Sequence, residues 1–131
     1  MSERHYLTSL FEPKSVAVIG ASERENSLGN ILFRNIVDGG YKGTLYPINP
    51  RYESILGIRA YKSVEDVGAR VELAIIATKP KTVPDIVEQC GRSGIKIVII
   101  ITPGFAEAGH AGAALERKTL EIARSYGVRV L

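Results

Sequence analysis

The sequence has few of the residues that indicate a disulfide-rich, membrane-spanning or base-stacking protein. Cys90 is its one cysteine, so no disulfide can form within the chain and a cysteine-based metal site is not expected. Tryptophan is absent and aromatic residues make up 7% of the chain, which argues against a platform for stacked nucleobases. No apolar run approaches the roughly 20 residues of a membrane span, and the first residues lack the apolar stretch of a secretion signal. We therefore expect a soluble, cytoplasmic protein.

A concentrated basic surface is also missing. The 17 lysine and arginine residues outnumber the acidic residues and give a net charge of +3, but they are scattered along the chain. Nucleic-acid binding requires a clustered basic patch, so the charge better suits a small polyanionic ligand. With 131 residues and 45% hydrophobic composition, the chain can form one core. We predict a single domain over residues 1–131, with residues 1–10 as an N-terminal lead-in.

Short apolar segments alternate with helical patterns along the chain. The predicted strands are 15–19, 44–48, 73–77, 97–101 and 128–131, with a shorter candidate at 57–61. Three of the first four are apolar throughout, which is typical of strands covered on both faces. The helical patterns cover 27–38, 83–90 and 113–126, and residues 63–67 resemble one capped turn. This order predicts an α/β fold, Rossmann-like and doubly wound, whose mainly parallel sheet carries helices on both faces.

The spacing of apolar residues predicts which side of each helix packs on the sheet. In the second helix this spacing places Cys90 in the core, where a small thiol packs like an apolar side chain. The predicted buried residues are Leu28, Ile31, Leu32 and Ile36 in the first helix, Val83, Ile86, Val87 and Cys90 in the second, and Leu115, Ile122, Ala123 and Tyr126 in the third.

The segments that directly follow four of the strands are rich in glycine, proline, hydroxyl and basic residues. In an open parallel sheet, ligands bind beyond the carboxyl ends of the strands. Each segment alone could serve only to turn the chain, but together they predict one binding site. The segments are Gly20-Ala21-Ser22, Asn49-Pro50-Arg51, Thr78-Lys79-Pro80 and Thr102-Pro103-Gly104-Phe105.

The first of these segments has the features of a phosphate-binding loop. It connects a buried strand to a helix, so backbone N–H groups and the positive end of the helix dipole would face a bound anion. Gly20 allows a tight turn, and Gly29 allows helix and strand, or helix and ligand, to approach closely. The hydroxyl and amide groups of Ser22, Asn26 and Ser27 can donate to phosphate oxygens. The loop is longer than the G-x-G-x-x-G pattern of dinucleotide-binding folds.

The second segment bears on the identity of the ligand. NAD-binding folds place a carboxylate near the end of the second strand, where it accepts hydrogen bonds from ribose hydroxyls. This sequence instead has Arg51 there, and a guanidinium suits a phosphorylated ribose. NADP and coenzyme A (CoA) both carry such a phosphate, although Arg51 could equally be an ordinary solvated residue. No catalytic residues or metal ligands stand at a recognisable spacing, and His110 is not assigned a role.

Three stretches closely resemble the CoA-binding domain of ADP-forming acyl-CoA synthetases. They read FEPKSVAVIGAS over residues 11–22, GTLYPINPRY over 43–52 and IIITPGF over 99–105. The resemblance extends from about residue 10 to residue 131. The same domain begins certain bacterial protein lysine acetyltransferases, and it more distantly resembles the alpha subunit of succinyl-CoA synthetase.

The resemblance implies a position for each part of CoA. Many relatives have lysine where this chain has Arg51, so the charge is kept while the contact geometry differs. The implied contacts are Gly20, Ala21 and Ser22 with the phosphates; Asn49, Pro50 and Arg51 with the nucleotide end; Thr78, Lys79 and Pro80 with the pyrophosphate or pantetheine; and Thr102, Gly104 and Phe105 toward the thiol arm.

The resemblance also implies a larger parent enzyme. Such synthetases convert acyl-CoA, ADP and phosphate into a carboxylic acid, CoA and ATP, through a phosphohistidine in a following domain. We therefore expect an excised domain, inactive alone, whose parent adds phosphohistidine and ATP-grasp domains or subunits. Two other hypotheses for the function stay open. The chain could be a CoA-binding regulatory module of a protein lysine acetyltransferase, or an NAD(P)-binding domain of an oxidoreductase or redox sensor.

Overall fold

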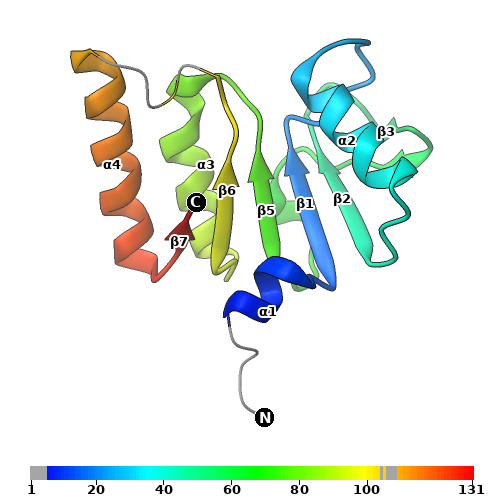
Figure 1. The fold of residues 1–131 in the computed structure, drawn as a ribbon, viewed down its shortest axis with the longest axis horizontal. Coiled ribbons are helices and arrows are strands. Elements are labelled where there is room, and N and C mark those ends of the chain that lie inside the picture. The colour runs from blue at the N-terminus through cyan, green and yellow to red at the C-terminus, as the bar shows by residue number, and fades with distance from the viewer. Residues whose placement is uncertain (1–5, 104, 106–108) are drawn as a thin grey trace.

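The computed structural model describes residues 6–103, 105 and 109–131. Its main sheet has five strands in the order β2-β1-β5-β6-β7, and all four neighbouring pairs are parallel. Figure 1 shows these strands side by side with their carboxyl ends at the same edge. The strands are β1 (Ser15–Ile19), β2 (Thr44–Ile48), β5 (Leu73–Ile76), β6 (Ile97–Ile100) and β7 (Arg129–Val130).

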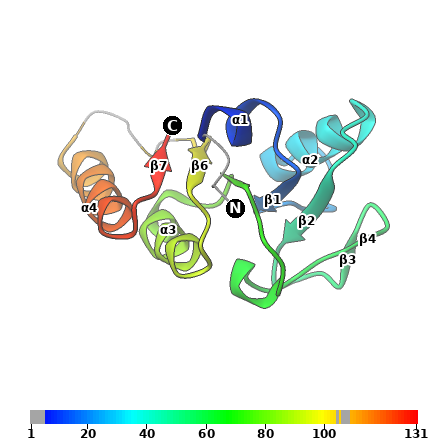
Figure 2. The same ribbon diagram turned by 90° about the horizontal axis from the view of Figure 1, so that it is seen from below.

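Helices cover both faces of this sheet. Helices α1 (Tyr6–Phe11) and α2 (Leu28–Asp38) lie on one face, and α3 (Val83–Arg92) and α4 (His110–Tyr126) lie on the other, as Figure 2 shows. The strand order runs outward in one direction from β1 to β2 and in the opposite direction from β5 to β7. The predicted doubly wound, Rossmann-like α/β class is therefore confirmed.

The strand residues divide between two core layers. Val16 and Val18 pack in the layer that contains Phe33 of α2, whereas Ala17 and Ile19 pack in the layer that contains Val87 of α3. Because successive side chains of a strand point to opposite faces, a strand covered on both faces needs apolar residues at every position. All five residues of β1 are buried, which explains the absence of polar alternation in its sequence.

The segment of residues 49–61 follows β2 and returns to cover the outer edge of that strand. It contains the antiparallel pair β3 (Ser54–Ile55) and β4 (Ile58–Arg59), and then returns alongside β2. There the Tyr61 amide donates to the Pro47 carbonyl (3.0 Å) and the Asn49 amide donates to the Tyr61 carbonyl (2.9 Å). The candidate strand at 57–61 is thus two residues long and belongs to a separate hairpin.

Two 3₁₀ turns complete the connections. The turn η1 (Val64–Asp66) confirms the capped turn predicted at 63–67, since the Ser63 hydroxyl accepts from the Glu65 amide (3.2 Å). The second turn, η2 (Pro80–Thr82), leads directly into α3. Among the described residues, no helix is both long enough and apolar enough to span a lipid bilayer.

The structure has one helix that the sequence did not predict, and another that begins earlier than predicted. Residues 6–11, most of which we expected to be a lead-in, form α1, and Leu10 packs beneath the sheet against the α2-side core. A helix of six residues is too short for apolar periodicity to reveal it. Helix α4 begins at His110 rather than at residue 113, within a Gly- and Ala-rich stretch that carries no strong start signal.

The buried face of α2 also differs from the prediction. Leu28 and Ile31 are 37% and 46% exposed, whereas Gly29, Asn30 and Phe33 are buried. The reason is that α2 contacts the end of β1 at Gly29. The helix therefore turns Gly29 and Asn30 toward the sheet in place of their apolar neighbours Leu28 and Ile31. The other two predicted residues, Leu32 and Ile36, are partly buried and pack against this core layer. The prediction is therefore confirmed for Leu32 and Ile36 and wrong for Leu28 and Ile31, because a pattern of apolar residues gives no weight to glycine.

The prediction for Cys90 is confirmed, because its side chain is fully buried in the core layer beneath α3. Removal from water disfavours the charged thiolate. Burial accordingly raises the pKa of the Cys90 thiol to about 12.

We therefore expect Cys90 to be unreactive in the folded protein. A pH of 8 is well below the pKa of this thiol, so almost no nucleophilic thiolate forms. The surrounding core also excludes reagents. Ellman's reagent should modify no thiol in buffer and one thiol per chain in concentrated urea. Rapid modification of the native protein would contradict the buried position of Cys90.

Candidate ligand-binding site

The carboxyl ends of the strands are joined to one another by backbone hydrogen bonds. The Gly20 amide donates to the Ile48 carbonyl (2.9 Å), and the Ala77 amide donates to the Ile19 carbonyl (2.8 Å). The Ile101 amide donates in turn to the Ile76 carbonyl (3.0 Å). The four predicted segments therefore leave the sheet next to one another, at the upper edge in Figure 1. The strand order reverses between β1 and β5, which is where such sheets bind ligands.

Two glycines allow the first segment to fit between its neighbours. Gly20 has φ of +100°, and a Cβ there would lie 2.9 Å from the carbonyl oxygen of Ala77, the residue just before the third segment. A Cβ on Gly29 would lie 1.8 Å from the Gly20 carbonyl oxygen, a distance that no side chain can accommodate. Both glycines are thus required where the first turn of α2 packs directly on the end of β1.

The hydroxyl groups of the first segment organise the loop itself. Ser27 caps α2 by accepting from the Asn30 amide (3.2 Å), and it donates to the Arg24 carbonyl (2.7 Å). The Ser22 hydroxyl oxygen accepts from the Arg24 amide (2.9 Å). These bonds give the loop a defined shape without a ligand.

Several backbone amides of the same loop are left available. Among the described residues, no hydrogen-bond acceptor is found for the N–H groups of Ser22, Glu23, Leu28 and Gly29. The last two are the first amides of α2, which no intrahelical carbonyl can satisfy. Free amides at a helix N-terminus attract anions because they add to the positive end of the helix dipole.

The second segment is bonded to the first through Asn49. The Asn49 Nδ2 group donates to the Ala21 carbonyl (3.0 Å), and its Oδ1 atom accepts from the Arg51 amide (2.9 Å). The carboxamide of Asn49 therefore has a bonding partner on each side within the protein. Pro50 and Arg51 are exposed, so the Arg51 guanidinium is accessible to a ligand.

Two further hydrogen bonds join the loop after β1 to residues that follow the second segment. The Tyr52 hydroxyl lies 3.2 Å from the Ser22 hydroxyl, and the Leu56 amide donates to a carboxylate oxygen of Glu23 (3.0 Å). Tyr52 ends the stretch 43–52 that carries the family resemblance, but no role was predicted for it or for Glu23. Their hydrogen bonds, to Ser22 and Leu56 respectively, become visible only in three dimensions.

The third segment begins the turn that leads into α3. Thr78 is partly exposed, and its hydroxyl oxygen accepts from the Thr82 hydroxyl (2.7 Å). Lys79 is exposed and Pro80 opens η2. Thr78 also lies beside Gly20, because its methyl group would be 3.2 Å from a Cβ at that position. The structure thus brings this segment against the first one.

Two residues of the fourth segment, Thr102 and Phe105, are buried, whereas Pro103 is exposed. Thr102 is 7% exposed and its hydroxyl donates to the Ile76 carbonyl (3.4 Å). The side chain of Phe105 packs in the core layer of α3. Gly104 lies outside the described residues. The placement of Thr102, Gly104 and Phe105 toward a thiol arm stays a prediction.

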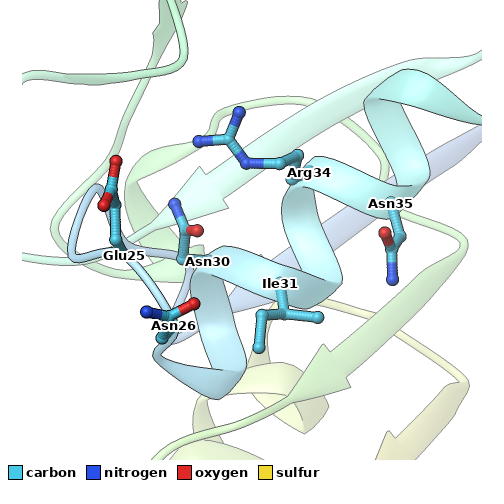
Figure 3. A pocket seen from close by; sticks show the side chains of 6 residues that line it. All are labelled: Glu25, Asn26, Asn30, Ile31, Arg34 and Asn35. Carbon is cyan, nitrogen blue, oxygen red and sulfur yellow. The ribbon is translucent and has the colours of Figure 1, made fainter.

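A hollow of about 280 Å³ lies beside the N-terminal half of α2. Figure 3 shows the Arg34 side chain reaching back toward the loop that carries Glu25, with Asn30 between the two. Sequence analysis did not predict this hollow. Its lining residues are Glu25, Asn26, Asn30, Ile31, Arg34 and Asn35.

Comparison with known protein families identifies the domain. A family model described as a CoA binding domain matches residues 14–131. The chain belongs to this family of CoA-binding domains. The resemblance seen in the sequence is thereby confirmed, and the phosphate-bearing ligand expected at the strand ends is coenzyme A.

Curated relatives of this CoA-binding domain include larger ligases. The ADP-forming acetate–CoA ligase I of Archaeoglobus fulgidus is 46% identical over 122 residues, which cover 93% of this chain and 18% of that protein. The ADP-forming 4-hydroxybutyrate–CoA ligase of Nitrosopumilus maritimus is 43% identical over 122 residues, covering 93% of this chain and 17% of that protein. The chain thus spans about a fifth of the length of these relatives.

Solved structures give the same result. The dinucleotide-forming acetyl-coenzyme A synthetase 1 of Ca. Korarchaeum cryptofilum, in complex with phosphate and ADP, superimposes with a TM-score of 0.90 at 38% identity. The match covers 95% of this chain and 26% of that structure's chain. The CoA-binding domain therefore has the fold of one part of a larger enzyme.

We expect Gly29→Ala to destabilise the CoA-binding domain by about 3 kcal/mol, the upper end of the usual cost of overpacking. The added methyl group would meet the Gly20 carbonyl and force α2 away from β1. Urea denaturation measures the loss in the free energy of unfolding. Asn35→Ala, an exposed change on the same helix, is the control and should alter stability little. Equal stability of the two variants would show that α2 does not pack this closely.

Proposed function

We propose that the domain holds CoA along the carboxyl edge of the sheet, with the pyrophosphate over the first turn of α2. The observation that carries this proposal is the set of unsatisfied amides at Ser22, Glu23, Leu28 and Gly29. They lie where the strand order reverses, and they combine hydrogen-bond donors with a helix dipole of the sign that phosphate requires.

Charged residues at the neighbouring strand ends support this orientation. The exposed Arg51 would bind the 3′-phosphate of the nucleotide, since a guanidinium can donate two parallel hydrogen bonds to a phosphate group. The exposed Lys79, on the other side of the Gly20 loop, would lie near the pyrophosphate or the pantetheine arm. Thr102, at the end of β6, would follow along that arm toward the thiol.

The parent protein that we propose is an ADP-forming acyl-CoA synthetase. In that reaction acyl-CoA, ADP and phosphate give a carboxylic acid, CoA and ATP. This domain would supply CoA binding, and the phosphohistidine and ATP-grasp domains would supply phosphoryl transfer. Similar identities to ligases named for acetate and for 4-hydroxybutyrate suggest that the choice of acid is made outside this domain.

A ligand panel tests the proposed function directly. By isothermal titration calorimetry, CoA should bind most tightly, 3′-dephospho-CoA more weakly, and NADP and NAD least. The order follows from a site that recognises both the pyrophosphate and the 3′-phosphate, with space for a narrow arm instead of a second nucleoside. Tighter binding of NADP than of CoA would instead indicate a nicotinamide-dependent oxidoreductase or sensor.

A substitution at Arg51 tests the position of the nucleotide end. Arg51→Ala should weaken CoA binding by about 1 to 3 kcal/mol, the scale of a hydrogen bond to a charged group, because the 3′-phosphate loses its cation. The affinity for 3′-dephospho-CoA should not change. Arg117→Ala removes an exposed arginine of α4 and is the matched control. If Arg51→Ala binds CoA like the control, the 3′-phosphate lies elsewhere.

A further inference from the structure

Two successive carbonyl groups of the phosphate loop each receive a hydrogen bond from an asparagine. Asn49, which follows β2, donates through Nδ2 to the Ala21 carbonyl (3.0 Å). Asn30, in the first turn of α2, donates through Nδ2 to the Ser22 carbonyl (2.9 Å). The two donors come from different elements and reach neighbouring peptide groups of one loop.

These bonds also determine where two amide groups point. A peptide unit is planar and trans, so the carbonyl of one residue and the N–H of the next point in opposite directions. Holding the Ala21 carbonyl therefore orients the Ser22 N–H, and holding the Ser22 carbonyl orients the Glu23 N–H. These are two of the amides without an acceptor among the described residues.

Both asparagines are held firmly in place. Asn30 is 3% exposed, and its own backbone amide is bonded to the Ser27 cap. Figure 3 shows its side chain between the loop and the helix. The Oδ1 atom of Asn49 is bonded to the Arg51 amide, which sets the orientation of its carboxamide. In either position an aspartate of the same shape could not donate, and its charge would repel the carbonyl oxygen.

We propose that Asn30 and Asn49 are positioning residues, which turn the carbonyls of Ala21 and Ser22 away from the ligand and aim the amides of Ser22 and Glu23 at the CoA pyrophosphate. This inference rests on the proposed placement of the pyrophosphate over α2. A loop without these bonds could rotate its peptide units and present carbonyl oxygens, which repel phosphate. The two asparagines thus add to the serine hydrogen bonds that order the loop and help to preform the anion site.

The test combines calorimetry with amide NMR on the full 131-residue chain. Asn30→Asp and Asn49→Asp should each weaken CoA binding about tenfold or more, the effect expected for hydrogen bonds to a charged ligand. Asn49→Ala should do the same without adding charge. Asn35→Asp adds the same charge at an exposed position of α2 and should bind CoA nearly as well as the unaltered chain.

The amide signals distinguish a positioning role from a general loss of structure. In the unaltered chain, CoA should shift the Ser22 and Glu23 amides strongly. In the Asn30 and Asn49 variants those shifts should shrink, while amides of the sheet keep their native positions. If Asn30→Asp does not fold, the partly exposed Asn49 still provides the test.

The remaining outcomes separate the two proposals. If CoA binds the unaltered chain but leaves the Ser22 and Glu23 amides unshifted, the proposed position of the pyrophosphate is wrong. If those amides shift in the unaltered chain and the asparagine variants bind CoA equally well with the same shifts, the position stands and the positioning role is overturned. Equal weakening by Asn35→Asp would assign the effect to charge alone and would overturn it as well.

Discussion

The whole site depends on the close contact between α2 and the end of β1. Gly29 lies so near the Gly20 carbonyl that a methyl group would stand 1.8 Å from its oxygen. This contact brings the first amides of α2 to the point where the strand order reverses. It also rotates the helix, so that Asn30 faces inward and Leu28 and Ile31 face outward. A side chain at residue 29 would separate these features from one another.

The second property of the site is that its loops are held by the protein itself. Asn49, Tyr52 and Leu56 each make a hydrogen bond to the loop after β1, and Ser27 caps the helix that follows. A loop already ordered in the free protein loses less conformational entropy when the ligand binds. Most side-chain hydrogen bonds near the candidate site therefore maintain its shape, while the backbone amides without an acceptor among the described residues and the exposed cations are accessible to a ligand.

This arrangement suits a domain that binds a carrier. The described groups at the strand ends include backbone amides, hydroxyls, the exposed cations of Arg51 and Lys79 and the Glu23 carboxylate, and the one cysteine is buried in the core. In the related ligases the matching region is only 17–18% of the protein, so most of each ligase lies outside the region that matches this domain. The fold supplies a fixed edge along which a long, thin ligand can be held.

The sequence by itself determined the class of fold, the order of strands and helices, and the segments that meet at the ligand edge, because apolar runs and glycine-rich strand ends are local patterns. The tight turn at Gly20 was recognisable for the same reason, whereas a role for Arg51 in binding stays a prediction. The tertiary structure alone decided that Gly29 and Asn30 of α2 are buried while Leu28 and Ile31 are exposed, and which residues orient the loop. Asn30, Glu23 and Tyr52 act through partners that are 8, 33 and 30 positions away in the chain, and no pattern within a single segment records such contacts.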